Sequence, residues 1–94
     1  MKLYTISDIN YELIKDFREG FDFEEVSSKL TDYFYDYDYV VGDWAYGKLR
    51  LKGFYESKNK NTKPLNDIKY LEKYINESCA KNCKYFVLRK NNWK

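Results

Sequence analysis

The sequence has 94 residues, a size typical of one domain, so we expect residues 1–94 to form a single domain. It contains no histidine, which removes the commonest general base and metal ligand, and no run of about 18 apolar residues that would span a membrane. The net charge is +2, and aromatic residues make up 20% of the chain, so their rings must supply much of the core.

Two strands are expected at the start of the chain. Residues 2–6 fit a short edge strand, and turn-forming residues follow at 7–10. Residues 11–17 alternate apolar and polar side chains, which is the period of a half-buried strand. Ile14 interrupts the polar side of this strand, so the alternation is imperfect.

A helix is expected from about Phe23 to Tyr35. Asp22 is a good N-cap, and Glu25 completes a capping box three residues later. Apolar residues then recur at helical spacing. Several aspartates crowd the expected C-terminal end, where the helix dipole disfavours negative charge.

The stretch from residue 39 to residue 56 reads as a β-hairpin. Residues 39–41 are apolar on both faces, as in an interior strand, and residues 42–47 supply a glycine-bounded connection. In residues 48–56 two leucines lie on one face. The other face carries Lys48, Arg50, Lys52 and Phe54.

The last part of the chain predicts a loop, a helix and a strand. Residues 57–63 are polar and charged, and we expect a flexible loop there. Pro64 leads into a second helix whose apolar stripe includes Ile68 and Cys79. Residues 84–90 are apolar on both faces in their centre, so we expect an interior strand, followed by a polar C-terminal tail at residues 91–94.

The expected order of elements is ββαββαβ, which is typical of an α+β fold with a mostly antiparallel sheet. After the first strand, this is the split βαβ order of ferredoxin-like folds. Each amphipathic helix offers one apolar surface, so we expect both helices to pack on one face of the sheet. The opposite face would then be open to a ligand.

Two motifs resemble a known family. The first is Val41-Gly42-Asp43-Trp44-x-Tyr46-Gly47-x-Leu49-Arg50-Leu51-Lys52-Gly53-Phe54, and the second is Cys79-x-x-x-Cys83-x-Tyr85-Phe86-Val87-Leu88. They resemble the YutD-like family of small cytoplasmic proteins from low-GC Gram-positive bacteria, and the resemblance runs from about Tyr11 to Leu88. It implies a cytoplasmic protein but assigns no reaction, substrate or catalytic residue. Asn82 stands where family members often carry glycine.

The hairpin combines cations with aromatic rings, a pattern typical of nucleic-acid contact. Lysine and arginine neutralise phosphates, and an exposed ring offers a surface on which a base can stack. We therefore predict a binding module that meets RNA or a ribonucleoprotein through this strand face. The alternative is a solvated charged face beside a core aromatic cluster. The candidate ligand-binding residues are Asp43, Trp44, Tyr46, Lys48, Arg50, Lys52 and Phe54.

Charge is divided unevenly along the chain. Residues 1–47 carry 4 basic and 11 acidic residues, whereas residues 48–94 carry 13 basic and 4 acidic residues. This division favours a basic side that meets an anionic partner, or two halves that attract each other in the fold. A second hypothesis is a protein-interaction or regulatory adaptor that uses the Tyr- and Asp-rich side from Tyr33 to Tyr46, because tyrosine is enriched at interfaces.

The sequence offers no recognisable catalytic or metal-binding pattern, so we expect no enzyme, no cofactor and no metal. Asp43 either caps amides of the turn or forms a buried ion pair with Arg50. Cys79 and Cys83 are too few for a zinc site. A disulfide between them is geometrically possible, but without a signal peptide we expect a reducing cytosol, with Cys79 as a buried thiol on the helix's apolar stripe. The oligomeric state stays open.

Overall fold

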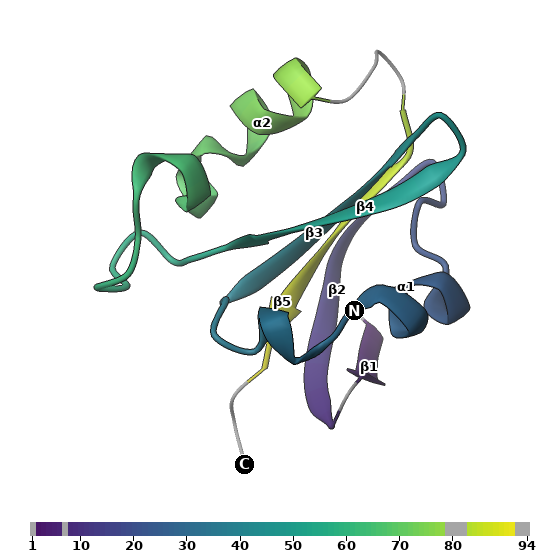
Figure 1. The fold of residues 1–94 in the computed structure, drawn as a ribbon, viewed down its shortest axis with the longest axis horizontal. Coiled ribbons are helices and arrows are strands. Elements are labelled where there is room, and N and C mark those ends of the chain that lie inside the picture. The colour runs from purple at the N-terminus through teal and green to yellow at the C-terminus, as the bar shows by residue number, and fades with distance from the viewer. Residues whose placement is uncertain (1, 7, 79–82, 92–94) are drawn as a thin grey trace.

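The computed structural model describes residues 2–6, 8–78 and 83–91. The predicted Asn82 helix stop, the Cys79 thiol and most of the tail lie outside these residues. Figure 1 shows a strand-rich fold with two α-helices in the described part of the chain. The elements are β1 (Lys2–Ile6), β2 (Ile9–Phe17), α1 (Phe23–Lys29), the 3₁₀ turn η1 (Asp32–Phe34), β3 (Tyr39–Ala45), β4 (Lys48–Phe54), the 3₁₀ turns η2 (Pro64–Asn66) and η3 (Ile68–Tyr70), α2 (Leu71–Ser78) and β5 (Tyr85–Lys90).

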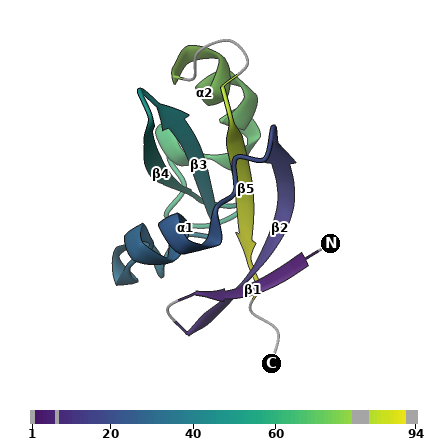
Figure 2. The same cartoon turned by 90° about the vertical axis from the view of Figure 1, so that its right-hand side faces the viewer.

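The five strands form one antiparallel sheet in the order β1-β2-β5-β3-β4. The last strand in sequence, β5, therefore lies in the middle of the sheet, between β2 and β3 (Figure 2). The prediction of an α+β fold with an antiparallel sheet and two helices is confirmed. So is the interior position of β3 and β5, which follows from their apolar residues on both faces.

The prediction that both helices pack on one face of the sheet is wrong. Val26 and Leu30 from the α1 segment belong to a core cluster with Phe86 and Leu88 of β5. Val87, which points the other way, belongs to a second cluster beneath α2. Each face of the sheet thus has its own helix, with α2 above and α1 below in Figure 1.

The ferredoxin-like arrangement is also not observed. A ferredoxin-like sheet would place β4 between β2 and β3, whereas here β5 separates them and β4 forms an edge. The physical reason is the two-sided burial of β5: Phe86, Val87 and Leu88 are each at most 1% exposed, which requires a central position and cover on both faces.

Three local features refine the predicted elements. The pairing of β2 with β5 shifts register between Leu13 and Lys15, so Ile14, which interrupts the alternation, sits at a β-bulge.

The Asp22 carboxylate caps α1 by accepting a hydrogen bond from the Glu25 N–H at 3.2 Å. However, α1 ends at Lys29 rather than near residue 35. Leu30 already has an extended backbone, and a longer helix would place the following aspartates at its C-terminal end, where negative charge is unfavourable.

The hairpin connection is shorter than predicted. Strand β3 continues to Ala45, so the turn consists of Tyr46 and Gly47 alone. Both have positive φ, 54° and 75°, as a two-residue type I′ turn requires. Gly42, Asp43 and Trp44 therefore lie in a strand instead of in a loop.

The polar segment of residues 57–63 is closed into hydrogen-bonded turns. The Asn59 N–H donates to the Glu56 carbonyl at 2.9 Å, and the Thr62 N–H donates to the Asn59 carbonyl at 3.0 Å. Its flexibility stays a prediction. Cys83, just before β5, is disulfide-bonded, so the expectation of reduced cysteines is wrong there. No helix in the described part of the chain is long and apolar enough to cross a membrane.

Candidate binding surfaces

A buried ion pair joins the two strands of the hairpin. Asp43 is 1% exposed, and the Arg50 side chain directly across the strand pair donates to both carboxylate oxygens, from Nε and Nη2, at 2.9 Å each. This hydrogen bonding raises the pKa of the Arg50 guanidinium. Of the two roles predicted for Asp43, the ion pair is therefore the observed one. Arg50 is 46% exposed and so can still present part of its guanidinium to solvent.

Phe54 is not available as a stacking surface. It is 1% exposed because Tyr74 of α2 packs edge-on against it, with ring centroids 5.5 Å apart. The Lys52 ammonium lies 5.3 Å from the Phe54 centroid and 5.6 Å from the Tyr74 centroid, so it covers the same aromatic pair. The expectation that the Phe54 ring points into solvent is wrong, since α2 covers this end of the strand.

The two aromatic residues near the turn have different surroundings. Trp44 lies on the α1 face, and its indole Nε1 donates to the Gly20 carbonyl at 2.7 Å. Tyr46 is fully exposed at the turn, and the neighbouring Lys48 is also exposed. The seven predicted site residues therefore do not form one site: Trp44 and Phe54 lie on opposite faces of the sheet.

Cations from three strands nevertheless gather at one end of the sheet. Antiparallel pairing puts the end of β2, the start of β4 and the start of β5 at the end of the sheet that carries the Tyr46 turn. Lys15 lies on the α2 face, and Lys84, over the Trp44 ring, lies on the α1 face. We call this region the basic end. It comprises Lys15, Arg18, Lys48, Arg50 and Lys84.

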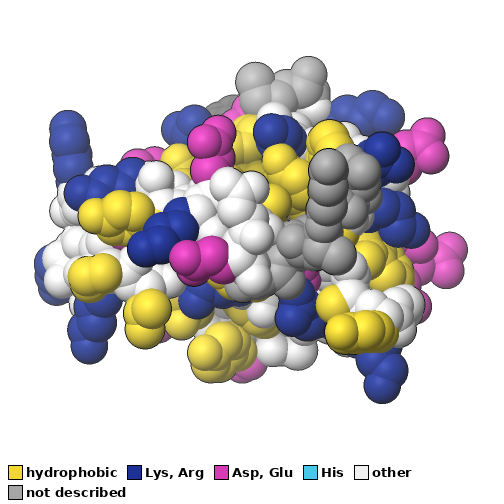
Figure 3. Space-filling view, turned by 90° about the horizontal axis from the view of Figure 1, so that it is seen from above, with side chains coloured by type: hydrophobic (Ala, Val, Ile, Leu, Met, Phe, Trp, Pro, Cys, Tyr) yellow, Lys and Arg dark blue, Asp and Glu magenta, His cyan; other side chains and the backbone are white. Residues whose placement is uncertain are grey.

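Three cations of the basic end, Lys15, Arg18 and Lys84, lie over aromatic rings. The Lys15 ammonium lies 5.4 Å from the Tyr85 centroid, and a hydrogen bond with Tyr85 raises the pKa of Lys15. The Lys84 ammonium lies 4.9 Å from the Trp44 ring centroid. In Figure 3, which views the α2 side, Lys and Arg side chains border hydrophobic side chains. Sequence reasoning missed Lys15 and Lys84 because strand pairing, which it had not assigned, brings them to the hairpin.

A second surface is formed by α1 and η1, and we call it the acidic–aromatic surface. Three of its rings face solvent: Phe23 is 44% exposed, Tyr33 69% and Tyr35 39%. Four exposed carboxylates surround them, those of Glu24, Glu25, Asp32 and Asp36. The Lys90 ammonium approaches its edge, where it donates to the Tyr35 carbonyl at 2.6 Å.

Tyr37 anchors η1 to the hairpin. Its ring lies over Gly53 and 4.7 Å from the Tyr55 centroid, while the exposed Tyr33 ring lies 6.0 Å away. A hydrogen bond with Tyr33, together with burial, raises the pKa of Tyr37 to about 12. The Tyr33-to-Tyr46 side proposed from the sequence is not one patch, because β3 separates its two ends by about 20 Å at roughly 3.3 Å per residue.

Among the described residues, no group of three or more His, Cys, Asp or Glu side chains is arranged to hold a metal ion. The two surfaces described above therefore carry the argument about function.

Comparison with known proteins gives consistent results. Residues 5–89 match the family described as "Putative antitoxin YutD-like". The chain is 41% identical over 88 residues to a Bacillus subtilis (strain 168) protein named "Putative antitoxin YutD", covering 94% of this chain and 97% of that protein. It also resembles the solution NMR structure of yutD from B. subtilis, with a TM-score of 0.82 and 38% identity, covering 98% of this chain and 84% of that one.

Proposed function

The chain belongs to the YutD-like family, and from this membership we propose that it acts as an antitoxin, a binding module that neutralises a partner by covering it. The name of the B. subtilis relative supports this role. Such action needs a recognition surface and no catalytic group, cofactor or metal, and we place it in the cytoplasm.

The acidic–aromatic surface is the contact that we propose, with a protein partner. The observation that carries the proposal is the exposure of Phe23, Tyr33 and Tyr35 on one short segment among four carboxylates. Exposed aromatic area of this kind is a common mark of an interaction site, and tyrosine and phenylalanine are enriched at interfaces. The surrounding negative charge favours a partner with a basic surface.

Partner capture tests this proposal. A tagged chain would be crosslinked in nuclease-treated lysate, and the captured protein identified, purified and titrated against the chain by calorimetry. We expect the double variant Tyr33→Ala/Tyr35→Ala to bind at least about tenfold more weakly, since exposed tyrosines act as interface hot spots. Tyr46→Ala is the matched control, because it removes an exposed tyrosine from the far end of β3. Equal affinity of the double variant and the wild type would rule out this surface.

A second candidate function is contact with RNA or a ribonucleoprotein through the basic end. The observation that favours it is that Lys15, Arg18, Lys48 and Lys84 lie at the end of the sheet that also carries the exposed Tyr46 ring. In this version Tyr46, rather than Phe54, provides the stacking surface. Phosphate neutralisation would supply most of the affinity.

Fluorescence anisotropy with a labelled single-stranded RNA distinguishes the second candidate. Binding should weaken steeply as salt rises, and the variant Lys15→Ala/Lys48→Ala/Lys84→Ala should flatten the logarithmic salt dependence by about 0.7 per lost phosphate contact. Lys29→Ala, on the α1 side, is the control for a loss of positive charge elsewhere. If no anisotropy change occurs even at low salt, this candidate fails while the protein-partner proposal stands.

A further inference from the structure

Two pockets adjoin where η2, η3 and α2 approach the end of β4. One has a volume of about 340 Å³ and the other about 230 Å³, and Pro64 and Tyr70 line both. Neither pocket belongs to the basic end or to the acidic–aromatic surface. Since β4 spans about 20 Å at roughly 3.3 Å per residue, they also lie far from the Tyr46 turn.

The larger pocket has a mostly aromatic and apolar lining, which suits a flat apolar ring. Buried Phe54 lies at its inner side, and Tyr74, Tyr70 and Leu65 supply further walls. Tyr70 is 41% exposed and Leu65 is 84% exposed, so the rim offers apolar surface that no part of the described chain covers. Lys73 and Glu77 add polar groups at its border.

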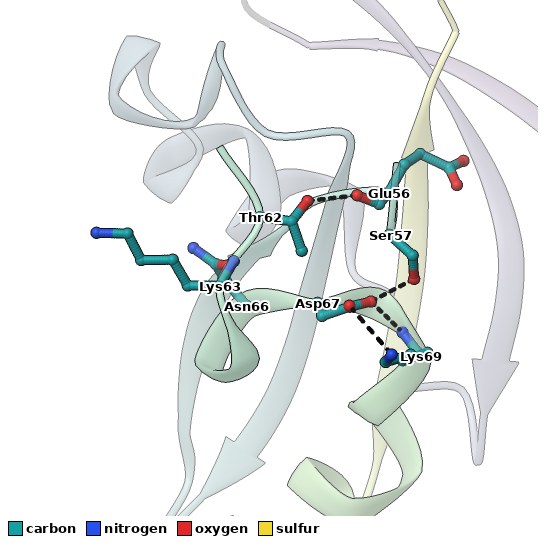
Figure 4. Close-up of polar contacts among 7 residues, drawn as sticks. All are labelled: Glu56, Ser57, Thr62, Lys63, Asn66, Asp67 and Lys69. Atoms are coloured by element: carbon teal, nitrogen blue, oxygen red, sulfur yellow. Dashed lines mark hydrogen bonds and ion pairs between the residues drawn. The ribbon is translucent and has the colours of Figure 1, made fainter. Parts of the chain in front are cut away.

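The smaller pocket is polar, and its hydroxyl groups already donate their hydrogens. Ser57 donates to the 7% exposed Asp67 carboxylate, and Thr62 donates to the Glu56 carbonyl (Figure 4). The oxygens of Ser57 and Thr62 can therefore only accept further hydrogen bonds. A ligand group that meets these two oxygens must therefore donate a hydrogen bond, as a ribose hydroxyl can.

Positive charge flanks the seam between the pockets. The Lys69 ammonium lies 4.0 Å from the Asp67 carboxylate and 5.2 Å from the Tyr70 centroid, and it is 59% exposed. Lys63 lines the polar pocket and extends outward in Figure 4. The Asp67 carboxylate opposes an anion, but it already accepts from Ser57 and from the Lys69 N–H. In Figure 4 the Lys63 and Lys69 side chains lie on opposite sides of Asp67, so a phosphate beside Lys63 would be on the side away from the Lys69–Asp67 pair.

We propose that the two pockets together bind one nucleotide. The base occupies the larger pocket against Tyr70 and Tyr74, the ribose hydroxyls donate to Ser57 and Thr62, and the phosphate lies outside the polar pocket beside Lys63. The nucleotide is either a free mononucleotide or one unit of an RNA strand, which share this chemistry. The inference goes beyond the proposed protein contact and does not depend on it.

An NMR titration of the full chain tests the site. Nucleoside monophosphates should shift amide resonances in residues 63–74, whereas inorganic phosphate alone should not reproduce the effect. Tyr70→Ala should weaken binding at least about fivefold, because stacking on an aromatic ring contributes substantially per base. Leu65→Ser, at a highly exposed position, is a second variant that should weaken binding without unfolding the chain. Leu3→Ser, at an exposed apolar position on β1, is the matched control and should leave the affinity unchanged.

The charge and the source of the nucleotide are tested separately. Lys63→Ala/Lys69→Ala should weaken binding of a mononucleotide but leave binding of the uncharged nucleoside unchanged. Tighter binding of a tetranucleotide than of a mononucleotide identifies an RNA unit, and equal affinity identifies a free nucleotide. The proposal is overturned if no mononucleotide shifts residues 63–74 at millimolar concentration and low salt, or if Leu3→Ser weakens binding as much as Tyr70→Ala does. Variants of the basic end remove the RNA contact of the second candidate function, so they distinguish that contact from nucleotide binding in the two pockets.

Discussion

At the scale of single residues, the Asp43 carboxylate depends on one partner. Two hydrogen bonds from Arg50 satisfy a carboxylate that is almost completely buried. Removal of Arg50 leaves that charge without its bidentate partner. The pair was foreseeable from the sequence as one of two alternatives, because a two-residue turn places the two positions opposite each other.

We expect Arg50→Ala to lower the free energy of unfolding by about 2 kcal/mol, less than for a fully buried pair because Arg50 is half exposed. Arg50→Lys should recover only part of this loss, since an ammonium group cannot bond both oxygens with the same geometry. Urea denaturation measures both variants. Lys48→Ala, an exposed cation in the same strand, should change stability by less than about 0.5 kcal/mol. A loss of that small size for Arg50→Ala would show that the pair contributes little.

Tyr11, unlike Asp43, carries a buried polar group that has no hydrogen-bond partner in the described structure. Its side chain is 0% exposed, and its hydroxyl finds no hydrogen-bond partner in the described structure. We expect Tyr11→Phe to keep or raise stability, by up to about 1 kcal/mol, because it removes a buried unsatisfied hydroxyl. Thermal and urea denaturation measure the change. A clear destabilisation would instead mean that the hydroxyl is satisfied in solution.

Buried tyrosines also set an alkaline limit to stability. Burial raises the pKa of Tyr11 to about 12, and burial together with the hydrogen bond to Glu56 raises the pKa of Tyr39 to about 12, from 10.0. Both groups are protonated in either state below pH 10. Between pH 10 and 12 the unfolded chain releases these protons first, so stability should fall as the pH rises.

Urea denaturation between pH 8 and pH 12 measures this loss, which we expect to reach about 2 kcal/mol for each residue. Tyr11→Phe should make the decline shallower, whereas Tyr46→Phe, at a fully exposed position, should not alter it. A wild-type stability that stays constant to pH 12 would contradict the argument.

At the scale of elements, glycines let rings lie flat on the hairpin. A Cβ on Gly53 would lie 2.3 Å from the Tyr37 ring, and one on Gly42 would lie 2.1 Å from the Phe86 ring. Such a distance forces the ring or the strand to move. The Gly53 contact therefore joins η1 to β4, and the Gly42 contact joins β3 to β5 on the α1 side.

We expect Gly53→Ala to cost about 1–3 kcal/mol through overpacking. In a Tyr37→Ala background the same substitution should cost much less, because the ring that it meets is gone. A double-mutant cycle by denaturation measures this coupling. Equal penalties in both backgrounds would show that the effect of Gly53 lies in the strand backbone instead.

The strands were predictable from the sequence because their side-chain alternation is local. Ile14 even marked the bulge in β2, as the one position where the alternation fails. The faces that the helices cover were not predictable from their apolar stripes, because one stripe per helix does not say which face of the sheet it packs against. The two-sided burial of β5 held the missing information, since a strand apolar on both faces needs cover on both.

The sequence predicted the candidate surfaces only in part. Tyr46 and Lys48 are exposed as the hairpin pattern indicates, but a ring at Phe54 looks the same in sequence whether or not a helix covers it. Lys15 and Lys84 reach the basic end through pairing across the sheet, a relation between positions about 70 residues apart that no local pattern encodes.

At the scale of the whole molecule, the sheet consists of two hairpins joined by one strand. β1 pairs with β2 and β3 pairs with β4, and β5 connects the two pairs. The acidic–aromatic surface comes from the segment between the two hairpins, while the nucleotide pockets come from the segment between the second hairpin and β5. These two surfaces, unlike the basic end, can therefore be altered with little change to the strands.

The central place of β5 bears on how the protein is made. A ribosome releases the two hairpins before it releases the strand that unites them, so the nascent chain exposes two half-finished sheets with open edges. Assembly of the full sheet must wait until β5 has left the exit tunnel, so any contact that needs the complete sheet can form only after that strand is released.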